Sequence, residues 1–152
     1  MIRTPHSMKF TVIGLAFLTC FVTGVATAQQ GNVWKDLSEV SYKISEDEYG
    51  ELYVPEFGAN IKALEGKVVT ADGYIIPFEG MFKPEHIILS SLPLAECFFC
   101  GSGGPETVME VMLKQPIKYT SKRVKVKGKL TLNANDPEKL MYILQEGELM
   151  EN

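Results

Sequence analysis

Cysteine and histidine are scarce in this 152-residue sequence, which has only Cys20, Cys97, Cys100, His6 and His86. So few cysteines cannot form the disulfide framework of a small secreted miniprotein, and the fold must therefore rest on a hydrophobic core. Beyond residue 28 three of these five side chains remain, one short of the four ligands that close a structural zinc finger.

Other signatures are also missing. The sequence has no internal repeat and no low-complexity tract. Ser90 and Ser91 do not stand in a Gly-x-Ser-x-Gly context, so the nucleophile elbow of α/β-hydrolases finds no support.

Acidic residues are absent before Asp36, whereas the N-terminus carries basic residues. The apolar run Phe10–Val25 is shorter than the about 20 residues that a membrane-spanning helix needs, and it ends in Ala26–Ala28. This layout predicts a secretory signal peptide over residues 1–28, cleaved after Ala28, and a periplasmic or secreted protein without a spanning segment after cleavage.

Cys20 offers an alternative, lipid anchoring after cleavage directly before a cysteine. The residue before it is Thr19, whereas a lipoprotein signal is expected to have Gly, Ala or Ser there. We therefore favour cleavage after Ala28 and loss of Cys20 with the signal peptide.

The net charge excludes a further class of function. Removal of residues 1–28 takes away Arg3 and Lys9 and leaves 13 basic and 19 acidic residues, a net charge of −6. Such a domain has no broad basic surface for phosphate backbones, so nucleic-acid binding is not expected. The basic residues of segment 122–129 recur with a period of two, which is typical of one solvated face of a strand.

The remaining 124 residues suit one domain preceded by a lead-in. We expect residues 29–60 to pack on the core, with Trp34 as the apolar anchor, and residues 61–152 to form the domain. Within the lead-in, Val40–Ile44 predicts a short strand and the acidic Ser45–Gly50 a turn or loop.

Five later segments carry strand signals: 67–77, 86–90, 107–113, 123–132 and 141–149. Gly73 and Gly128 interrupt two of them and predict bends, by which a short sheet curls closed. We therefore predict a mostly β fold, a small five-stranded Greek-key barrel of the OB type. For segment 107–113 a helix opened by Pro105 is the alternative.

Cys97-Phe98-Phe99-Cys100 is the sharpest motif, and several interpretations compete. Two soft thiolates supply half of a tetrahedral site for zinc or cuprous copper, which His86 and a nearby acid can extend. The acids near the motif in sequence are Glu79, Glu85, Glu96 and Glu106. Alternatively, the sulfurs form a local disulfide in an oxidising envelope, although so short a ring stabilises by less than the about 3 kcal/mol of a 15-residue loop.

A thioredoxin-like redox pair is the third interpretation, but no βαβ pattern surrounds the cysteines and glycines follow them. Finally, Phe98 and Phe99 either face a protein partner or plug the end of the barrel, and we expect them to plug it.

Several of these motifs together resemble a family of small exported bacterial proteins of unknown function. The resemblance covers roughly residues 60–145 and rests on Gly66-Lys67-Val68, Gly73-Tyr74-Ile75-Ile76-Pro77, Leu89-Ser90, Cys97–Gly101, Gly104-Pro105-Glu106 and the Gly128-x-Leu130-x-Leu132-Asn133 stretch. It implies an OB-like barrel, an envelope location and an association with metal traffic. It carries over no catalytic residues, and many relatives have adjacent cysteines instead.

Taken together, the sequence predicts a non-enzymatic envelope protein that binds zinc or copper through Cys97, Cys100 and His86. The alternatives are a structural or interaction module with a Cys97–Cys100 disulfide and an envelope protein partner, and a thiol-disulfide redox protein.

Overall fold

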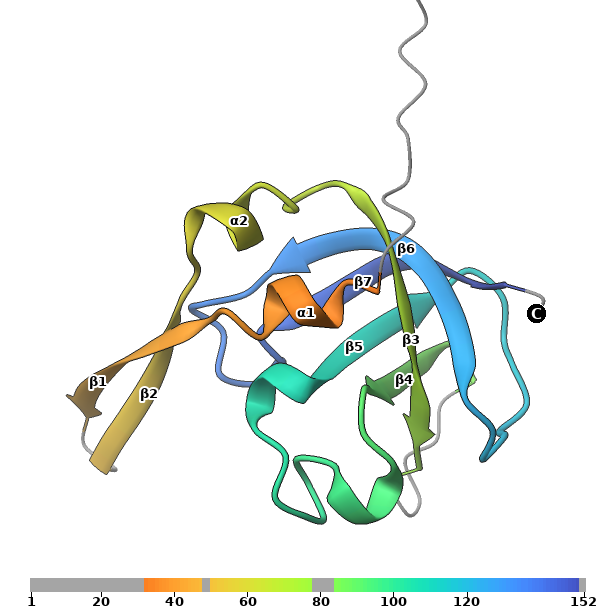
Figure 1. Ribbon diagram of the computed structural model, residues 1–152, viewed down its shortest axis with the longest axis horizontal. Coiled ribbons are helices and arrows are strands. Elements are labelled where there is room, and N and C mark those ends of the chain that lie inside the picture. Colours follow the sequence, from red (N-terminus) through yellow and green to blue (C-terminus); the bar gives the residue numbers. More distant parts are fainter. Residues whose placement is uncertain (1–31, 48–49, 78–83, 151–152) are drawn as a thin grey trace, which may run out of the picture.

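A computed structural model describes residues 32–47, 50–77 and 84–150, and it consists of a barrel with a two-stranded arm beside it (Figure 1). The barrel strands are β3 (Val68–Ile76), β4 (His86–Ser90), β5 (Val108–Leu113), β6 (Val124–Leu132) and β7 (Tyr142–Met150). They close in the order β3-β4-β5-β7-β6, with β5 and β7 parallel and every other pair antiparallel. The predicted mostly β, five-stranded OB-like barrel is confirmed.

The segment with two interpretations, 107–113, is a strand at the centre of the barrel wall. β5 pairs with β4 on one side and β7 on the other, and it is buried at every position except Met112. Met109 and Val111 face the core, so Glu110 between them points to the outside of the barrel. Pro105 opens only the short 3₁₀ turn η2 (Pro105–Thr107).

Gly73 and Gly128 lie where strands approach each other closely. A Cβ atom at Gly73 would lie within 3 Å of the Ser90 carbonyl oxygen and the Leu89 side chain, and one at Gly128 would meet Leu144 at 2.7 Å. The register between β6 and β7 shifts at Gly128, so this glycine marks a bulge that helps the sheet to bend.

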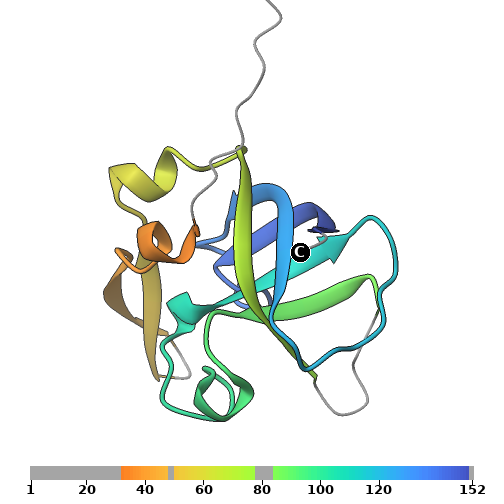
Figure 2. The same ribbon diagram turned by 45° about the vertical axis from the view of Figure 1, so that its right-hand side comes forward.

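The predicted lead-in seals one end of the barrel. Helix α1 (Trp34–Leu37) and helix α2 (Ala59–Lys62) place Trp34, Leu37 and Ile61 in the hydrophobic core. Trp34 Nε1–H donates to the Asp72 carbonyl oxygen (2.9 Å), and the Tyr142 hydroxyl donates to that of Leu37 (2.7 Å). Figure 2 shows α1 against the barrel wall. The anchoring role expected of Trp34 is therefore confirmed.

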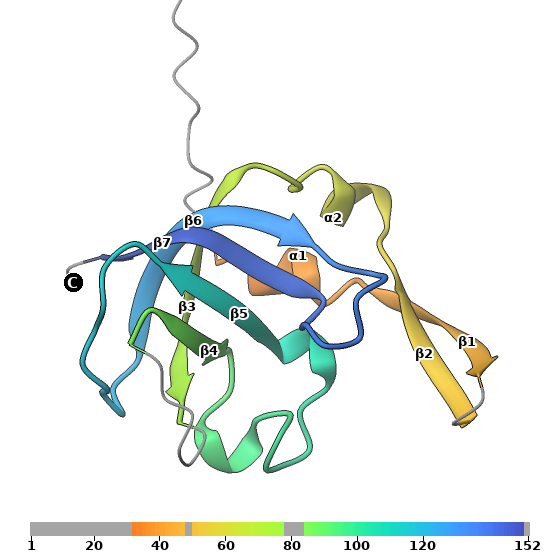
Figure 3. The same ribbon diagram turned by 180° about the vertical axis from the view of Figure 1, so that it is seen from behind.

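Between α1 and α2 an antiparallel hairpin, which we call the arm, projects from the barrel (Figures 1 and 3). It consists of β1 (Ser41–Asp47) and β2 (Gly50–Glu56). The predicted strand over Val40–Ile44 is therefore too short, and the prediction of a turn or loop over Ser45–Gly50 is wrong at residues 45–47 and 50, while residues 48–49 lie outside the described ones. Both faces of the arm are largely solvated, so its sequence lacks the alternation that burial on one face imposes.

Some predictions fall outside the described residues: the signal peptide, its cleavage site after Ala28, Cys20 and Glu79. Within the ranges that the structure describes, no helix has the length and apolar character needed to cross a bilayer.

The packing of the lead-in predicts the effect of changing Trp34. Trp34→Ala is expected to lower the free energy of unfolding by about 3–5 kcal/mol, the usual cost of deleting a buried aromatic side chain. Trp34→Phe loses the bond to Asp72 and retains most of the apolar area, so its cost should be smaller. Urea unfolding followed by circular dichroism measures both. Wild-type stability of the Ala variant would show that the lead-in contributes nothing to the core.

Candidate functional site

The two cysteines lie at a tight turn in the connection between β4 and β5. Helix η1 (Leu94–Glu96) leads into it, and the Cys97 carbonyl oxygen then accepts the N–H groups of Cys100 (3.2 Å) and Gly101 (2.8 Å). The Cys97 side chain is fully buried, whereas Cys100 is exposed. The turn therefore exposes Cys100 to solvent and buries Cys97.

Both cysteines are free thiols, and their side chains lie close enough to influence each other. Partial loss of hydration, the hydrogen bond with Cys97 and the charge of that neighbour raise the pKa of the Cys100 thiol. Metal ligation and nucleophilic redox catalysis both use the thiolate, which a raised pKa makes scarcer at neutral pH. The geometry brings the sulfurs together without activating the exposed one.

His86, the third predicted metal ligand, belongs to a different site. It begins β4, where its Nε2–H donates to Oε2 of Glu110 (2.9 Å). Nowhere in the described ranges do three His, Cys, Asp or Glu side chains gather as a metal site would require. Of the predicted acids, Glu106 accepts the hydroxyl of Tyr42 (3.1 Å), while Glu85 and Glu96 are exposed.

Glu110 connects the outer wall of the barrel with the loop of residues 133–141, which we call the 133–141 loop. Glu110 is 8 % exposed, and its Oε1 accepts the backbone N–H of Leu140 (2.6 Å) while its Oε2 accepts the ring Nε2–H of His86. Its surroundings form a groove of about 420 Å³ with polar and apolar lining residues, namely His86, Glu110, Met112, Thr131, Leu132, Asn133, Asp136, Lys139, Ile143 and Gln145. Because burial of an unpaired charge is costly, this carboxylate holds the loop to the barrel.

The 133–141 loop is also held from within. The Asn133 amide donates to the carbonyl oxygens of Asp136, Lys139 and Leu140, and its Oδ1 accepts the N–H groups of Asn135 and Asp136. Asp136 and Lys139 form an ion pair (2.7 Å) whose hydrogen bond lowers the pKa of Asp136. The loop is therefore a preformed wall.

Phe98 and Phe99 do not plug the barrel, so that prediction is wrong. Each is 39 % exposed, and the two rings pack edge to face with centroids 5.1 Å apart. The core cluster contains Trp34 and Leu37 of the lead-in and does not include either phenylalanine.

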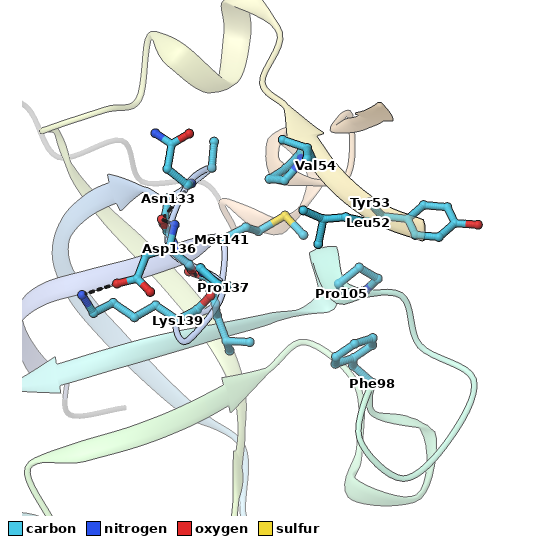
Figure 4. A pocket seen from close by; sticks show the side chains of 14 residues that line it. Leu52, Tyr53, Val54, Phe98, Pro105, Asn133, Asp136, Pro137, Lys139 and Met141 are labelled. Carbon is cyan, nitrogen blue, oxygen red and sulfur yellow. Dashed lines mark hydrogen bonds and ion pairs between the residues drawn. The ribbon is translucent and has the colours of Figure 1, made fainter. Parts of the chain in front are cut away.

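Phe98 lines a second groove, of about 370 Å³, which we call the arm groove (Figure 4). One side is the strand β2, from Leu52 to Pro55, and the other is the 133–141 loop, with Phe98 and Pro105 below. Its apolar lining consists of Leu52, Tyr53, Val54, Pro55, Phe98, Pro105, Ala134, Pro137, Leu140 and Met141. The cysteine turn thus positions one wall of an open, mostly apolar groove.

The base of the arm groove is rigid because the arm is bonded to the barrel there. The Tyr42 hydroxyl approaches both Glu106 and the sulfur of Met141 (3.9 Å), and burial together with the Glu106 charge raises the pKa of Tyr42. Phe57, just after β2, packs on Tyr142 with ring centroids 5.9 Å apart.

Sequence reasoning identified the cysteine motif but missed the arm groove. The wall that was not predicted is β2. Its Leu52 and Tyr53 are 42 % and 59 % exposed, so the strand lacks the alternation of apolar and polar residues that burial of one face imposes. The sequence offers little signal for this wall, because seven residues, four of them acidic, separate Ile44 from Leu52.

None of the family models, curated proteins and solved structures compared with the chain matches it. What the site does must therefore be argued from its own geometry.

The role of Glu110 can be tested with Glu110→Gln. An amide keeps the shape but loses the charge-assisted bonds to Leu140 and His86, so opening of the 133–141 loop should become easier by about 1–3 kcal/mol. Hydrogen exchange of that loop measures this, and Glu85→Gln, an exposed carboxylate beside His86, is the control. Unchanged exchange in the Glu110 variant would show that the carboxylate does not hold the loop.

Proposed function

We propose that this protein is an exported, non-enzymatic interaction module that binds a segment of a protein partner in the arm groove. The observation that carries the proposal is the convergence of exposed and half-buried apolar side chains from three separate parts of the chain: β2, the cysteine turn and the 133–141 loop. Exposed apolar surface bounded by polar residues is characteristic of binding sites.

The preformed walls also support binding. The Asn133 hydrogen bonds fix one side and the Tyr42–Glu106 bond fixes the base of the arm, so little conformational entropy is lost when a ligand enters. A volume of about 370 Å³ lies within the range of ligand sites.

In this proposal the cysteine pair has a structural role. After export, a low-molecular-weight disulfide oxidises the two thiols: two protons and two electrons leave, the oxidant is reduced to two thiols, and a Cys97–Cys100 bond forms. The tight turn, in which the Cys97 carbonyl oxygen accepts the N–H groups of Cys100 and Gly101, supports this closure because it brings the two residues together. The disulfide then fixes the turn that carries Phe98.

The envelope location rests on the N-terminal pattern of the sequence and on the resemblance to exported proteins. An acidic domain of net charge −6 after cleavage is consistent with a protein partner rather than nucleic acid.

Binding of zinc or copper stays a prediction with a narrower basis. Cys97 and Cys100 can offer two thiolates, but His86 is engaged by Glu110, so the remaining ligands have to come from water or from another chain, including the cysteine pair of a second copy.

The disulfide and the metal site are separated by one set of measurements. After incubation with oxidised glutathione, thiol titration should find no free thiol at positions 97 and 100, and the mass should fall by two hydrogens. Protein purified with reductant should contain no more zinc or copper than the Cys97→Ala/Cys100→Ala double variant. One metal ion per one or two reduced chains, absent from the double variant, would contradict the structural role and support the metal site.

Peptide selection tests the binding function itself. Random nine-residue peptides displayed on phage are selected against the folded protein, and the affinity of the enriched peptides is measured by calorimetry. Leu52→Asp should weaken binding about tenfold or more, because it places a charge in the desolvated centre of the groove. Leu149→Asp is the matched control, since the two leucines are 42 % and 40 % exposed and Leu149 lies outside the groove. Equal effects of both variants, or no enrichment, would refute the proposal.

A further inference from the structure

We propose that the partner segment binds in extended conformation, as a third strand along the unpaired edge of β2, and that it combines apolar with basic residues. This inference rests on the proposed binding function and specifies its mode and its partner.

The unpaired edge is the first argument. Each barrel strand has a neighbour on both sides, whereas β1 and β2 pair only with each other, so each keeps one edge that no other strand of the described residues covers. The arm groove is lined by four consecutive residues of β2, Leu52–Pro55, and by none of β1. Consecutive strand residues point to opposite faces, so a groove that touches all four runs along the edge of the strand.

The backbone of that edge is arranged to bind a strand. Pro55 pairs with Tyr42 and has no N–H, so this pair is of the kind that exchanges no hydrogen bonds within the arm. The alternation then makes the Tyr53–Ile44 and Glu51–Glu46 pairs of the same kind. The N–H and C=O groups of Tyr53 and Glu51 consequently point away from β1, where an added strand can take them up.

The side chains around the edge define the apolar part of the partner. Val54, Phe98 and Met141 line the groove on its arm, turn and loop sides. An added strand would direct every second side chain into this space, so those positions should be aliphatic or aromatic.

The charge of the arm defines the remaining positions. Segment 41–56 contains one basic residue, Lys43, and five acidic ones, Glu46, Asp47, Glu48, Glu51 and Glu56. On the loop side, Lys139 is neutralised by its ion pair with Asp136. Charge complementarity therefore favours lysine or arginine at the alternate positions of the partner. A second copy of this chain would bring another acidic arm, which the same charges repel.

Two variants at one position test the use of the edge. Tyr53→Pro removes the outward N–H and should leave the bonds between β1 and β2 intact, as Pro55 does two residues further along. Tyr53→Thr keeps the N–H and loses the ring, so it is the matched control. For a selected peptide we expect Tyr53→Pro to weaken binding about fivefold more than Tyr53→Thr does. Urea unfolding checks that both variants remain folded.

A second measurement uses the unaltered protein. The best selected peptide is synthesised with an N-methyl group at each backbone position in turn, which removes one donor at a time. Strand addition predicts that binding is weakened at every second position only, and that the selected sequences are enriched in Lys and Arg between apolar residues.

The outcomes separate this inference from the function on which it rests. Selected peptides that bind in a manner dependent on Leu52, but without alternation in the N-methyl series, would overturn strand addition and leave the binding module intact. Enrichment of acidic peptides would overturn the partner chemistry. Failure to select any peptide would overturn both. Alternation together with the Tyr53→Pro effect would establish the mode of binding.

Discussion

Closure of the five-stranded barrel is the constraint on which the rest of this structure depends. The parallel pairing of β5 with β7 places β5 between two neighbours and lets β6 return to β3, so the barrel strands satisfy one another's backbone groups. A closed barrel exposes no sheet edge. Any binding through backbone groups must therefore use the connections or the arm, which is where both grooves have at least one wall.

Closure also decides the role of Glu110. In a strand covered on both faces, an outward carboxylate loses most of its hydration and has to be paired. His86 and the Leu140 N–H provide that pairing, and in doing so they fold the 133–141 loop down beside the wall. The loop lines both grooves, so the polar His86–Glu110 contact acts on the apolar arm groove through the backbone of the loop rather than by direct contact.

The sequence was sufficient for features that depend on local pattern and burial. β-Branched and aromatic residues bounded by Gly and Pro located all five barrel strands, and Trp34 was identified as an anchor because so large an apolar side chain has few other uses. Features set by strand register were out of reach: His86 meets Glu110 because β4 pairs with β5 at Ile88 and Glu110, a pairing that no local pattern encodes. β2 was missed because a solvated strand has no alternation of apolar and polar residues. The prediction that Phe98 plugs the barrel failed because the core is filled by residues distant in sequence, among them Trp34 and Leu37.

An open strand edge can bind a partner, but it can also pair with the edge of another molecule and cause aggregation. The arm manages this in two ways. Pro55 removes a donor next to the barrel, and the acidic residues Glu46 and Glu51, which lie opposite each other on the two strands, repel a second arm. Between these two features Tyr53 lines the apolar arm groove, opposite the 133–141 loop that the Asn133 hydrogen bonds hold in place. The edge of β2 thus lacks a donor at Pro55, is acidic at the other end and is apolar in between. This combination disfavours pairing with a second copy of the chain and favours a basic partner segment.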